Sequence, residues 1–386
     1  SRRRHTRYIS VTGVQTCALP ISAARSSASA AGPSPLRSRP SARRRSASPP
    51  GVAEATGFGA IAAPRSSLRR AADRDHFCRA SRRVYPLNPR VRACVIFNPT
   101  AKGDKARHFR RHLDEFAAGV ALKPTQGPGD ARRLATEAVT DGFDTVVAAG
   151  GDGTLNEVLN GIADAPDGFA RARLAVLPLG TVNVFARELG LPLSLRGAWL
   201  AIAAGRERRI DAPYAEHACG AGPRRRYFAQ MAGAGLDAQA ISLVDWEMKK
   251  RISQFAYVLA GMKAMRGPHP AITVEADGRR VSGELVLVGN GRFYGGSLPV
   301  FPAARLDDGL LDLCVFPRVS WGLILRYAIG YVTGRPLIPR EVAWLRVPSA
   351  RLTADGTVPF ELEGDLGGTL PMELGLEPGV LRVVAP

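Results

Sequence analysis

Cysteines are few in this sequence, and long apolar runs are absent. Its 386 residues include five cysteines, none of them in a CxxC pair. A disulfide framework or a cysteine-based metal cluster is therefore not expected, which is typical of a protein from a reducing cytoplasm. No run of 18 or more apolar residues occurs, and residues 321–332, the nearest approach, include Arg326. The sequence thus predicts no membrane-spanning helix and leaves contact with a membrane surface open.

Acidic residues and lysine are scarce in the first 90 residues. This stretch holds 18 arginines, no lysine and three acids, which gives it a charge of +15 out of the chain's +19. The other 296 residues carry 35 basic and 31 acidic groups. The basic balance therefore belongs to the start of the chain, and the remainder gives no compositional indication of nucleic-acid binding.

Residues 1–88, called the leader below, are rich in Ser, Ala, Pro and Arg and have no sustained apolar period. This composition predicts disorder. Residues 11–22 resemble the translation of a sequencing adapter, so part of the leader is expected not to be natural protein. The alternative is a targeting peptide, because the stretch is rich in Arg and Ser, although no clean apolar core follows.

Strands and helices alternate from residue 91 onward. Strands are predicted at residues 91–97, 120–123, 145–150 and 174–177, each followed by a helical pattern. Such alternation predicts an α/β domain with a parallel sheet and helices on both faces, in which ligands bind beyond the carboxyl ends of the strands. Polar or Gly-containing loops follow all four strands and are expected on that edge; they begin at Asn98, Thr125, Gly150 and Gly180.

The third of these loops, Gly150-Gly151-Asp152-Gly153-Thr154, joins an apolar strand to a helical pattern. Glycines let the backbone N–H groups approach a ligand, and a helix N-terminus favours negative charge, so a phosphate is the expected ligand. A carboxylate there would repel phosphate unless it organises magnesium or accepts a proton. The alternative is an ordinary turn in which Asp152 caps the helix. In the helix that precedes this strand and loop, Asp130 is expected to be the cap before residue 131.

The second half of the chain reads as strands joined by turns. Period-two segments at residues 227–231, 272–276, 284–289, 311–316 and 343–347, with an Asp277-Gly278 turn, predict an antiparallel β-sandwich. Helices are expected near residues 250–265 and 321–333. The predicted division is a leader at 1–88, a nucleotide-binding α/β domain at 89–205 and a lipid-substrate sandwich domain at 206–386.

Several motifs appear in the order typical of one family. Residues from 92 to the end resemble the diacylglycerol kinase catalytic-domain family, which includes bacterial lipid kinases and is related to sphingosine kinases. The glycine loop alone is a weak signal because NAD kinases share it, whereas the ordered set is specific. The set consists of Asn98-Pro99 with Gly103, Thr125, residues 150–157, residues 180–183, residues 233–237, residues 307–312 and Glu363-Gly364-Asp365.

The resemblance implies transfer of the γ-phosphoryl group of ATP to a lipid hydroxyl, with Mg²⁺, at a membrane surface. It implies that Asp152 lies near the magnesium and the transferred phosphate, and that Asp308 with the backbone carbonyls of Arg305 and Leu310 forms a structural magnesium site. The residues it places in the ATP site are Asn98, Pro99, Thr100, Thr125, Gly150, Gly151, Asp152, Gly153, Thr154, Leu155, Asn156, Glu157, Gly180, Thr181 and Asn183.

The general base of the family comes from a late Asp-Gly-Glu element, which here reads Glu363-Gly364-Asp365. Asp365 is therefore expected to accept the proton from the lipid hydroxyl, with one methylene less reach, or Glu363 takes that role. A second departure is Val184, where many members have Asp.

Two other functions remain open from the sequence. One is an NAD kinase, which shares the glycine loop; the other is a catalytically inactive lipid-binding homologue, suggested by the swapped acidic element. An apolar cleft is expected to admit the acyl chain, with Phe255, Tyr257 and Leu259 as candidates for its wall. The sequence predicts neither which lipid is phosphorylated nor the oligomeric state.

Overall fold

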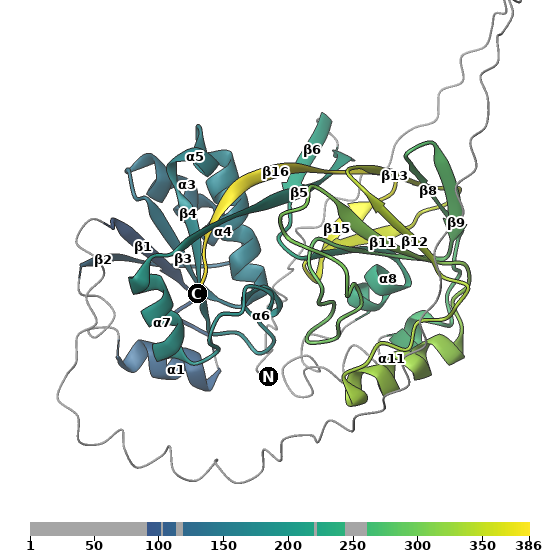
Figure 1. Ribbon diagram of the computed structural model, residues 1–386, viewed down its shortest axis with the longest axis horizontal. Helices are drawn as coiled ribbons and strands as arrows, with labels where there is room; N and C mark the ends of the chain where they lie inside the picture. The colour runs from purple at the N-terminus through teal and green to yellow at the C-terminus, as the bar shows by residue number, and fades with distance from the viewer. Residues whose placement is uncertain (1–90, 102, 113–118, 220–221, 244–260) are drawn as a thin grey trace, which may run out of the picture. The chain divides into compact units, whose positions relative to one another are not determined.

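The computed structural model describes residues 91–101, 103–112, 119–219, 222–243 and 261–386 (Figure 1). These residues belong to one compact unit, 82–386. The predictions for the leader, for most of the helix near residues 250–265 and for Phe255, Tyr257 and Leu259 lie outside the described residues.

A parallel sheet forms the base of the first lobe. Its strands are apolar runs, as expected where both faces of a sheet are buried. All five residues of β1, Ala-Cys-Val-Ile-Phe, are buried. The sheet order is β2 (Val120–Pro124), β1 (Ala93–Phe97), β3 (Thr145–Gly150) and β4 (Arg173–Pro178), with parallel pairing throughout. The predicted parallel sheet is confirmed.

Helices cover both faces of this sheet, because alternate strand residues point to opposite sides. Cys94 and Ile96 of β1 pack in one core cluster with α3 (Asp130–Thr140), α4 (Asp152–Asp164) and α6 (Val184–Glu188). Val95 and Phe97 pack in another with α1 (Asp104–Arg111) and α7 (Leu195–Ala204). A short helix, α5 (Gly168–Arg171), precedes β4.

The cap predicted for α3 is wrong by one residue. The helix begins at Asp130, and the residue before it, Gly129, adopts a left-handed conformation with φ of 82°. The carboxylate of Asp130 instead accepts a hydrogen bond from the backbone N–H of Gln126 at 2.9 Å. Asp130 therefore stabilises the loop that leads into the helix.

The second lobe contains an antiparallel six-stranded sheet. Its strands, in spatial order, are β12 (Ala343–Val347), β11 (Leu311–Phe316), β10 (Leu285–Gly289), β7 (Met231–Gly235), β14 (Pro359–Leu362) and β15 (Asp365–Thr369). Its inner residues pack in one core cluster with β8 (Ile272–Ala276) and β13 (Ala350–Ala354) of the other sheet. The predicted β-sandwich is confirmed, including the turn at Asp277-Gly278 into β9 (Arg279–Gly283).

Two long strands connect the lobes. β5 (Glu207–Cys219) pairs antiparallel with β16 (Met372–Val384), the last strand of the chain. β16 also pairs with β13 and, at Val383, in parallel with β4, so the first sheet continues into the second lobe (Figure 1). The predicted division near Gly205 falls between α7 and β5, and it remains a prediction.

The strand predicted at residues 227–231 is wrong. β6 (Gly222–Tyr227) ends where it was expected to begin, and β7 starts at Met231. The backbone N–H groups of Ala229, Gln230 and Met231 all donate to one carboxylate oxygen of Glu363. Since these donors converge on one side-chain atom, they cannot form a regular strand ladder.

Two helices follow strands of the six-stranded sheet along the chain. α8 (Leu236–Ser242) follows β7 directly. α11 (Trp321–Thr333) is the helix predicted at residues 321–333 and is confirmed. Ser320 caps its N-terminus by accepting from the N–H of Leu323, and Gly334 ends it with φ of 69°.

Candidate active site

The glycine loop between β3 and α4 packs against the loop that follows β4. A Cβ atom at Gly180 would lie 2.5 Å from the Cα of Gly151, and one at Gly150 would lie 2.4 Å from Oγ1 of Thr154. The N–H groups of Leu179 and Gly180 donate to the carbonyl of Gly150 at 2.9 and 3.1 Å. The two loops therefore form one backbone surface that leaves no room for side chains at these glycines.

Asn183 fixes the shape of the second loop. It is buried, has φ of 54°, and its Oδ1 accepts from the N–H of Gly180 at 3.0 Å while its Nδ2 donates to the Gly180 carbonyl at 2.7 Å. Asn tolerates this left-handed conformation better than most residues. The structure thus brings Gly150–Thr154 and Gly180–Asn183 together at the start of α4, where backbone N–H groups favour an anion.

Asp152 is the first residue of α4. The cap residue is Gly151, and no side chain caps the helix, so the alternative of Asp152 as a helix cap is wrong. Its Oδ1 accepts from the N–H of Phe185 at 3.4 Å. Burial raises the pKa of Asp152, while N–H groups of α6 and of Asn183 oppose that rise. A nearby cation would therefore stabilise the charge of this half-buried carboxylate.

The late acidic element is a tight hairpin. Glu363 and Gly364 form the two-residue connection between β14 and β15, with φ of 57° and 81°. Two left-handed residues are what a type I′ turn requires. Asp365 follows as an exposed residue, and its Oδ2 lies 3.7 Å from where a Cβ of Gly153 would be. The hairpin thus brings Asp365 beside the glycine loop, 212 positions earlier in the chain.

Glu363 points the other way, into the protein. Its Oε1 accepts from the N–H groups of Ala229, Gln230 and Met231 at 2.7, 2.5 and 3.3 Å. Its Oε2 is buried without a hydrogen-bond partner among the described residues. Burial raises the pKa of Glu363 to about 8, and the nearby charge of Asp152 adds to the rise. The free oxygen can therefore hold a proton or face a cation.

A cavity of about 470 Å³ is lined by Asp152 and Glu363 together with a set of apolar side chains, whereas Asp365 is not part of its wall. Asp152, Val182 and Val184 of the first lobe line it together with Glu363 and Gly364 of the hairpin. The rest of its wall is mainly apolar and comes from β7, α8, β10 and α11. A ligand with one polar end and an apolar body would match this distribution.

Comparison with known proteins identifies the family. Residues 92–214 match the profile described as diacylglycerol kinase catalytic domain, and residues 230–385 match the YegS C-terminal NAD kinase beta sandwich-like domain. The chain is 32% identical over 291 residues to a diacylglycerol kinase of Bacillus subtilis strain 168, covering 73% of this chain and 92% of the relative. The chain belongs to the diacylglycerol kinase catalytic-domain family.

Further relatives agree with this. A protein of Pseudomonas aeruginosa strain UCBPP-PA14, named probable lipid kinase YegS-like, is 34% identical over 300 residues, covering 76% of this chain and 93% of the relative. A crystal structure from Bacillus anthracis str. Sterne has a TM-score of 0.62 at 24% identity, covering 76% of this chain and 95% of the other. That likeness shows the shared fold. At the family level, the chain is a lipid kinase.

Several residues that the family resemblance places in the ATP site form hydrogen bonds within the protein that hold the surrounding loops. Glu157 accepts from the N–H groups of Gly129 and Ala131 at 2.9 and 3.0 Å, which holds the start of α3. Oδ1 of Asn98 accepts from the N–H and hydroxyl of Thr100 at 2.8 and 2.9 Å. The exposed Thr181 belongs to the second loop, whereas Leu155 and Asn156 are buried.

Three polar residues of the cavity wall were not all foreseen. Glu361 and Tyr294 are buried and Asp237 is half-buried, with the Tyr294 hydroxyl 2.5 Å from Asp237 and 3.0 Å from Glu361. Burial raises the pKa of both carboxyl groups, which favours their protonated forms. Asp237 lay in a polar segment that the sequence singled out, but Glu361 and Tyr294 had no signal beyond a polar residue in an apolar strand or loop.

At the structural magnesium site implied by the family, the carboxylates of Asp308 and Asp312 have partners within the protein. Oδ1 of Asp308 accepts from the N–H of Leu310 at 3.2 Å, and Oδ2 accepts from Arg346. Arg346 also pairs with Asp312 at 3.2 Å. No group of three or more metal-binding side chains occurs among the described residues. One guanidinium cannot neutralise both carboxylates, and Oδ2 of Asp312 is buried without a hydrogen-bond partner among the described residues. The metal site formed by Asp308 and the backbone carbonyls of Arg305 and Leu310 therefore stays a prediction.

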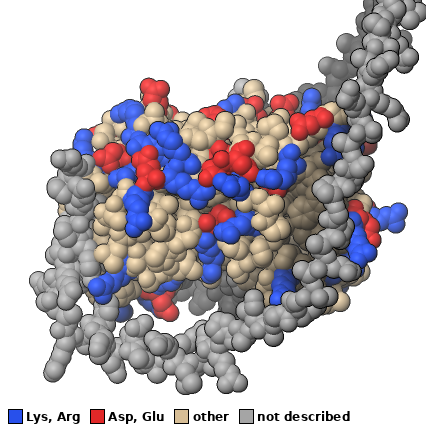
Figure 2. Space-filling view, in the orientation of Figure 1, with Lys and Arg blue, Asp and Glu red and all other residues tan. Residues whose placement is uncertain are grey.

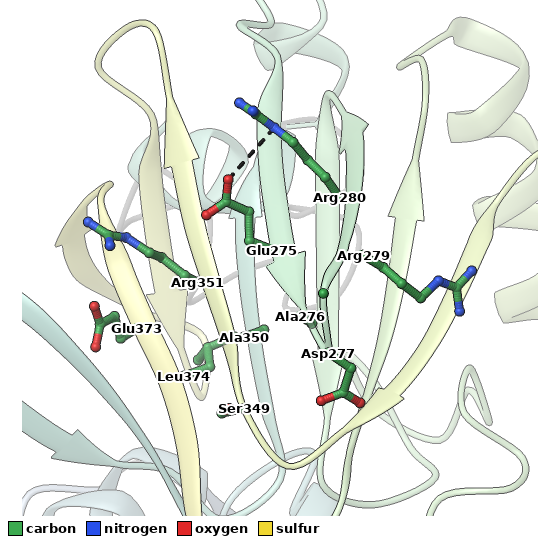
Figure 3. A pocket seen from close by; sticks show the side chains of 11 residues that line it. Glu275, Ala276, Asp277, Arg279, Arg280, Ser349, Ala350, Arg351, Glu373 and Leu374 are labelled. Atoms are coloured by element: carbon green, nitrogen blue, oxygen red, sulfur yellow. Dashed lines mark ion pairs between the residues drawn. The ribbon is translucent and has the colours of Figure 1, made fainter. Parts of the chain in front are cut away.

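A second cavity, of about 490 Å³, lies on the outer side of β8, β9, β13 and β16 (Figure 3). It is lined by charges of both signs, including a Glu275–Arg280 ion pair at 3.7 Å. None of the predicted site residues lines it. The face in Figure 2 likewise shows acidic and basic groups interspersed and no continuous basic patch. The second cavity therefore offers none of the predicted site residues.

No helix in the described part of the chain is both long and apolar enough to cross a bilayer.

Proposed function

We propose that this protein is an ATP-dependent lipid kinase that transfers the γ-phosphoryl group of MgATP to the hydroxyl of a diacylglycerol-like lipid. The observation that carries the proposal is the composition of one cavity. Asp152, Glu363 and Gly364 line it, and apolar side chains form most of the remaining wall. A hydroxyl on an apolar tail would place its reactive oxygen at the carboxylates.

Phosphoryl transfer depends on positioning and on neutralising charge. In the proposed reaction, backbone N–H groups of the glycine loop and of the loop after β4 would hold the phosphates, and Asp152 would hold the magnesium that enters with ATP. The lipid oxygen bonds to the γ-phosphorus as the bond to the bridging oxygen of ADP breaks. Asp365 accepts the hydroxyl proton, which is supported by its position beside Gly153.

Two alternatives are less well supported. For an NAD kinase, the acceptor would be a polar dinucleotide, and a mostly apolar cavity is a poor match. For an inactive lipid-binding homologue, the swapped acidic element should have lost its position, yet the hairpin still carries a carboxylate to the glycine loop.

The experiment compares phosphoryl transfer to different acceptors. The purified protein is incubated with labelled ATP and Mg²⁺ and with diacylglycerol, phosphatidylglycerol, a sphingoid base or NAD, and products are identified by mass spectrometry. The proposal predicts a phosphorylated lipid and unmodified NAD. Phosphorylated NAD, or no labelled product with any acceptor, would contradict it.

A further inference from the structure

α11 exposes an apolar stripe to solvent. Trp321, Leu325 and Ile329 recur every four residues, and their side chains are 53%, 60% and 42% exposed. Residues at this spacing lie on one face of a helix. Val332, in the last turn, is 84% exposed. Contiguous apolar surface of this kind on a protein marks an interaction site more often than chance.

The other side of the same helix lines the cavity at Asp152. Leu323, Ile324, Tyr327 and Tyr331 contribute to the wall, and so does Val332. Because Val332 both lines the cavity and is largely exposed, the cavity opens at the last turn of α11. The exposed stripe and the proposed lipid site are thus continuous.

The charges around this helix are nearly all positive. Residues 317–341 contain the exposed arginines Arg318, Arg326, Arg335 and Arg340 and a single acid, Glu341. α11 has no acidic residue in its first turn, and its sequence contains none elsewhere. Apolar side chains flanked by arginine match the acyl region and the anionic headgroups of a bilayer surface. A second copy of the chain docking here would instead bring like charges together.

We propose that α11 docks on an anionic lipid bilayer, with Trp321, Leu325 and Ile329 inserted at the level of the acyl chains and the arginines among the headgroups. A lipid tail then passes from the bilayer to the cavity at Val332 without crossing water. Figure 1 shows α11 at the periphery of the described structure, as this requires. The inference rests on the proposed lipid kinase function.

The test is cosedimentation with vesicles of phosphatidylcholine, with and without phosphatidylglycerol. Leu325→Glu combined with Ile329→Glu places two charges on the stripe and leaves every cavity-lining residue unchanged. Its partition onto anionic vesicles should fall at least about tenfold, since burying a charge in the acyl region is unfavourable. Leu200→Glu, at a leucine of α7 that is 44% exposed, is the matched control and should bind like wild type.

A charge variant tests the headgroup contact. Arg326→Gln combined with Arg335→Gln should weaken binding to anionic vesicles and reduce its salt dependence, while leaving the weak binding to neutral vesicles unchanged. Equal binding of wild type and the double glutamate variant would overturn the proposal. So would a wild-type dimer that becomes a monomer in that variant while vesicle binding is absent, because the stripe would then be a contact between two copies.

The outcome can be separated from that of the proposed function. With a short-chain diacylglycerol dissolved as monomers, the double glutamate variant should retain wild-type transfer, whereas transfer to long-chain diacylglycerol in vesicles should fall with binding. A wild-type protein that binds vesicles through the stripe but phosphorylates no lipid would refute the kinase proposal and uphold the surface. If the wild type phosphorylates lipid but its vesicle binding does not depend on the stripe, the kinase proposal stands and the docking surface is refuted.

Discussion

Glu363 and Asp365 lie two residues apart and in different surroundings. Glu363 turns inward, where three backbone N–H groups hold one of its oxygens, while Asp365 is exposed beside Gly153. Glutamate at positive φ costs on the order of 1 kcal/mol, which these hydrogen bonds offset. The swapped order therefore places the longer side chain where it can reach into the protein and the shorter one beside the glycine loop.

The hairpin carboxylates should separate in activity. Asp365→Asn is expected to abolish phosphoryl transfer, because the amide keeps the shape but cannot accept the proton. Glu363→Gln should lower kcat only about tenfold, through the local field, since the amide oxygen still accepts from the N–H groups. Asp365→Glu should retain or raise kcat. Initial rates with diacylglycerol decide, and an inactive Glu363→Gln beside an active Asp365→Asn would exchange the roles.

Burial of Glu363 also predicts a pH dependence of stability. Its pKa is about 8 in the folded protein against 4.5 in the ordinary case. Between these values the folded state holds a proton that the unfolded state has released, so its contribution to stability is greatest below pH 4.5 and is lost as pH rises toward 8. Glu363→Gln removes this loss, on the order of 1 kcal/mol per pH unit.

Urea unfolding of the nucleotide-free protein from pH 5 to pH 8 measures this difference. The free energy of unfolding should decline less steeply with pH in Glu363→Gln than in the wild type. Parallel curves for the two proteins would show that Glu363 is already ionised across this range.

At the scale of elements, the two loops at the edge of the parallel sheet act as one surface. Gly151 and Gly180 touch through their backbones, so their positions depend on each other. β3 and β4 are adjacent and parallel, which places both loops at the same edge. The nucleotide surface is therefore a product of strand order and of glycine at the contact.

Adding one methyl group at this contact should weaken nucleotide binding. In Gly180→Ala the new Cβ would lie 2.5 Å from the Cα of Gly151, so the backbone must move. The KM for ATP is expected to rise at least about tenfold, equivalent to about 1.4 kcal/mol, because the N–H groups lose their alignment. Gly127→Ala, in a loop where a Cβ meets nothing within 4 Å, should leave KM unchanged. Equal KM values for both variants would contradict the account.

At the scale of the whole molecule, the sequence predicted those elements whose signal lies within a few neighbouring residues. The strands β1 to β4 are apolar runs with turn signals, and the glycine loop is a contiguous motif, so both could be predicted. β5 and β16 were missed because β16 contains two Gly and a Pro, and its partners lie between about 20 and more than 200 residues away. Pairing at such separation leaves little trace in a sequence window.

The site divides in the same way. Asp152 could be found from its motif, whereas Asp365 entered through the family resemblance and only the fold brings it to Gly153. Glu361 and Tyr294 are single polar residues among apolar neighbours, and they become recognisable only when tertiary contacts place them with Asp237.

The leader should be dispensable. Removing residues 1–85 is expected to leave the melting temperature and lipid kinase activity unchanged, since its composition offers no apolar core. Thermal unfolding and the transfer assay on the truncated chain test this, and an insoluble or inactive product would refute it.

Label transfer from γ-labelled ATP to diacylglycerol, compared between the wild type and Asp152→Asn, tests the central claim most directly. The substitution keeps the shape of a half-buried side chain whose charge is made unfavourable by desolvation, so the melting temperature should stay the same or rise. If Asp152 organises magnesium and the charge of the transferred phosphate, labelled lipid product should form at least about a hundredfold more slowly in the variant. Wild-type transfer by a stably folded Asp152→Asn, or no labelled lipid from the wild type, would contradict the account.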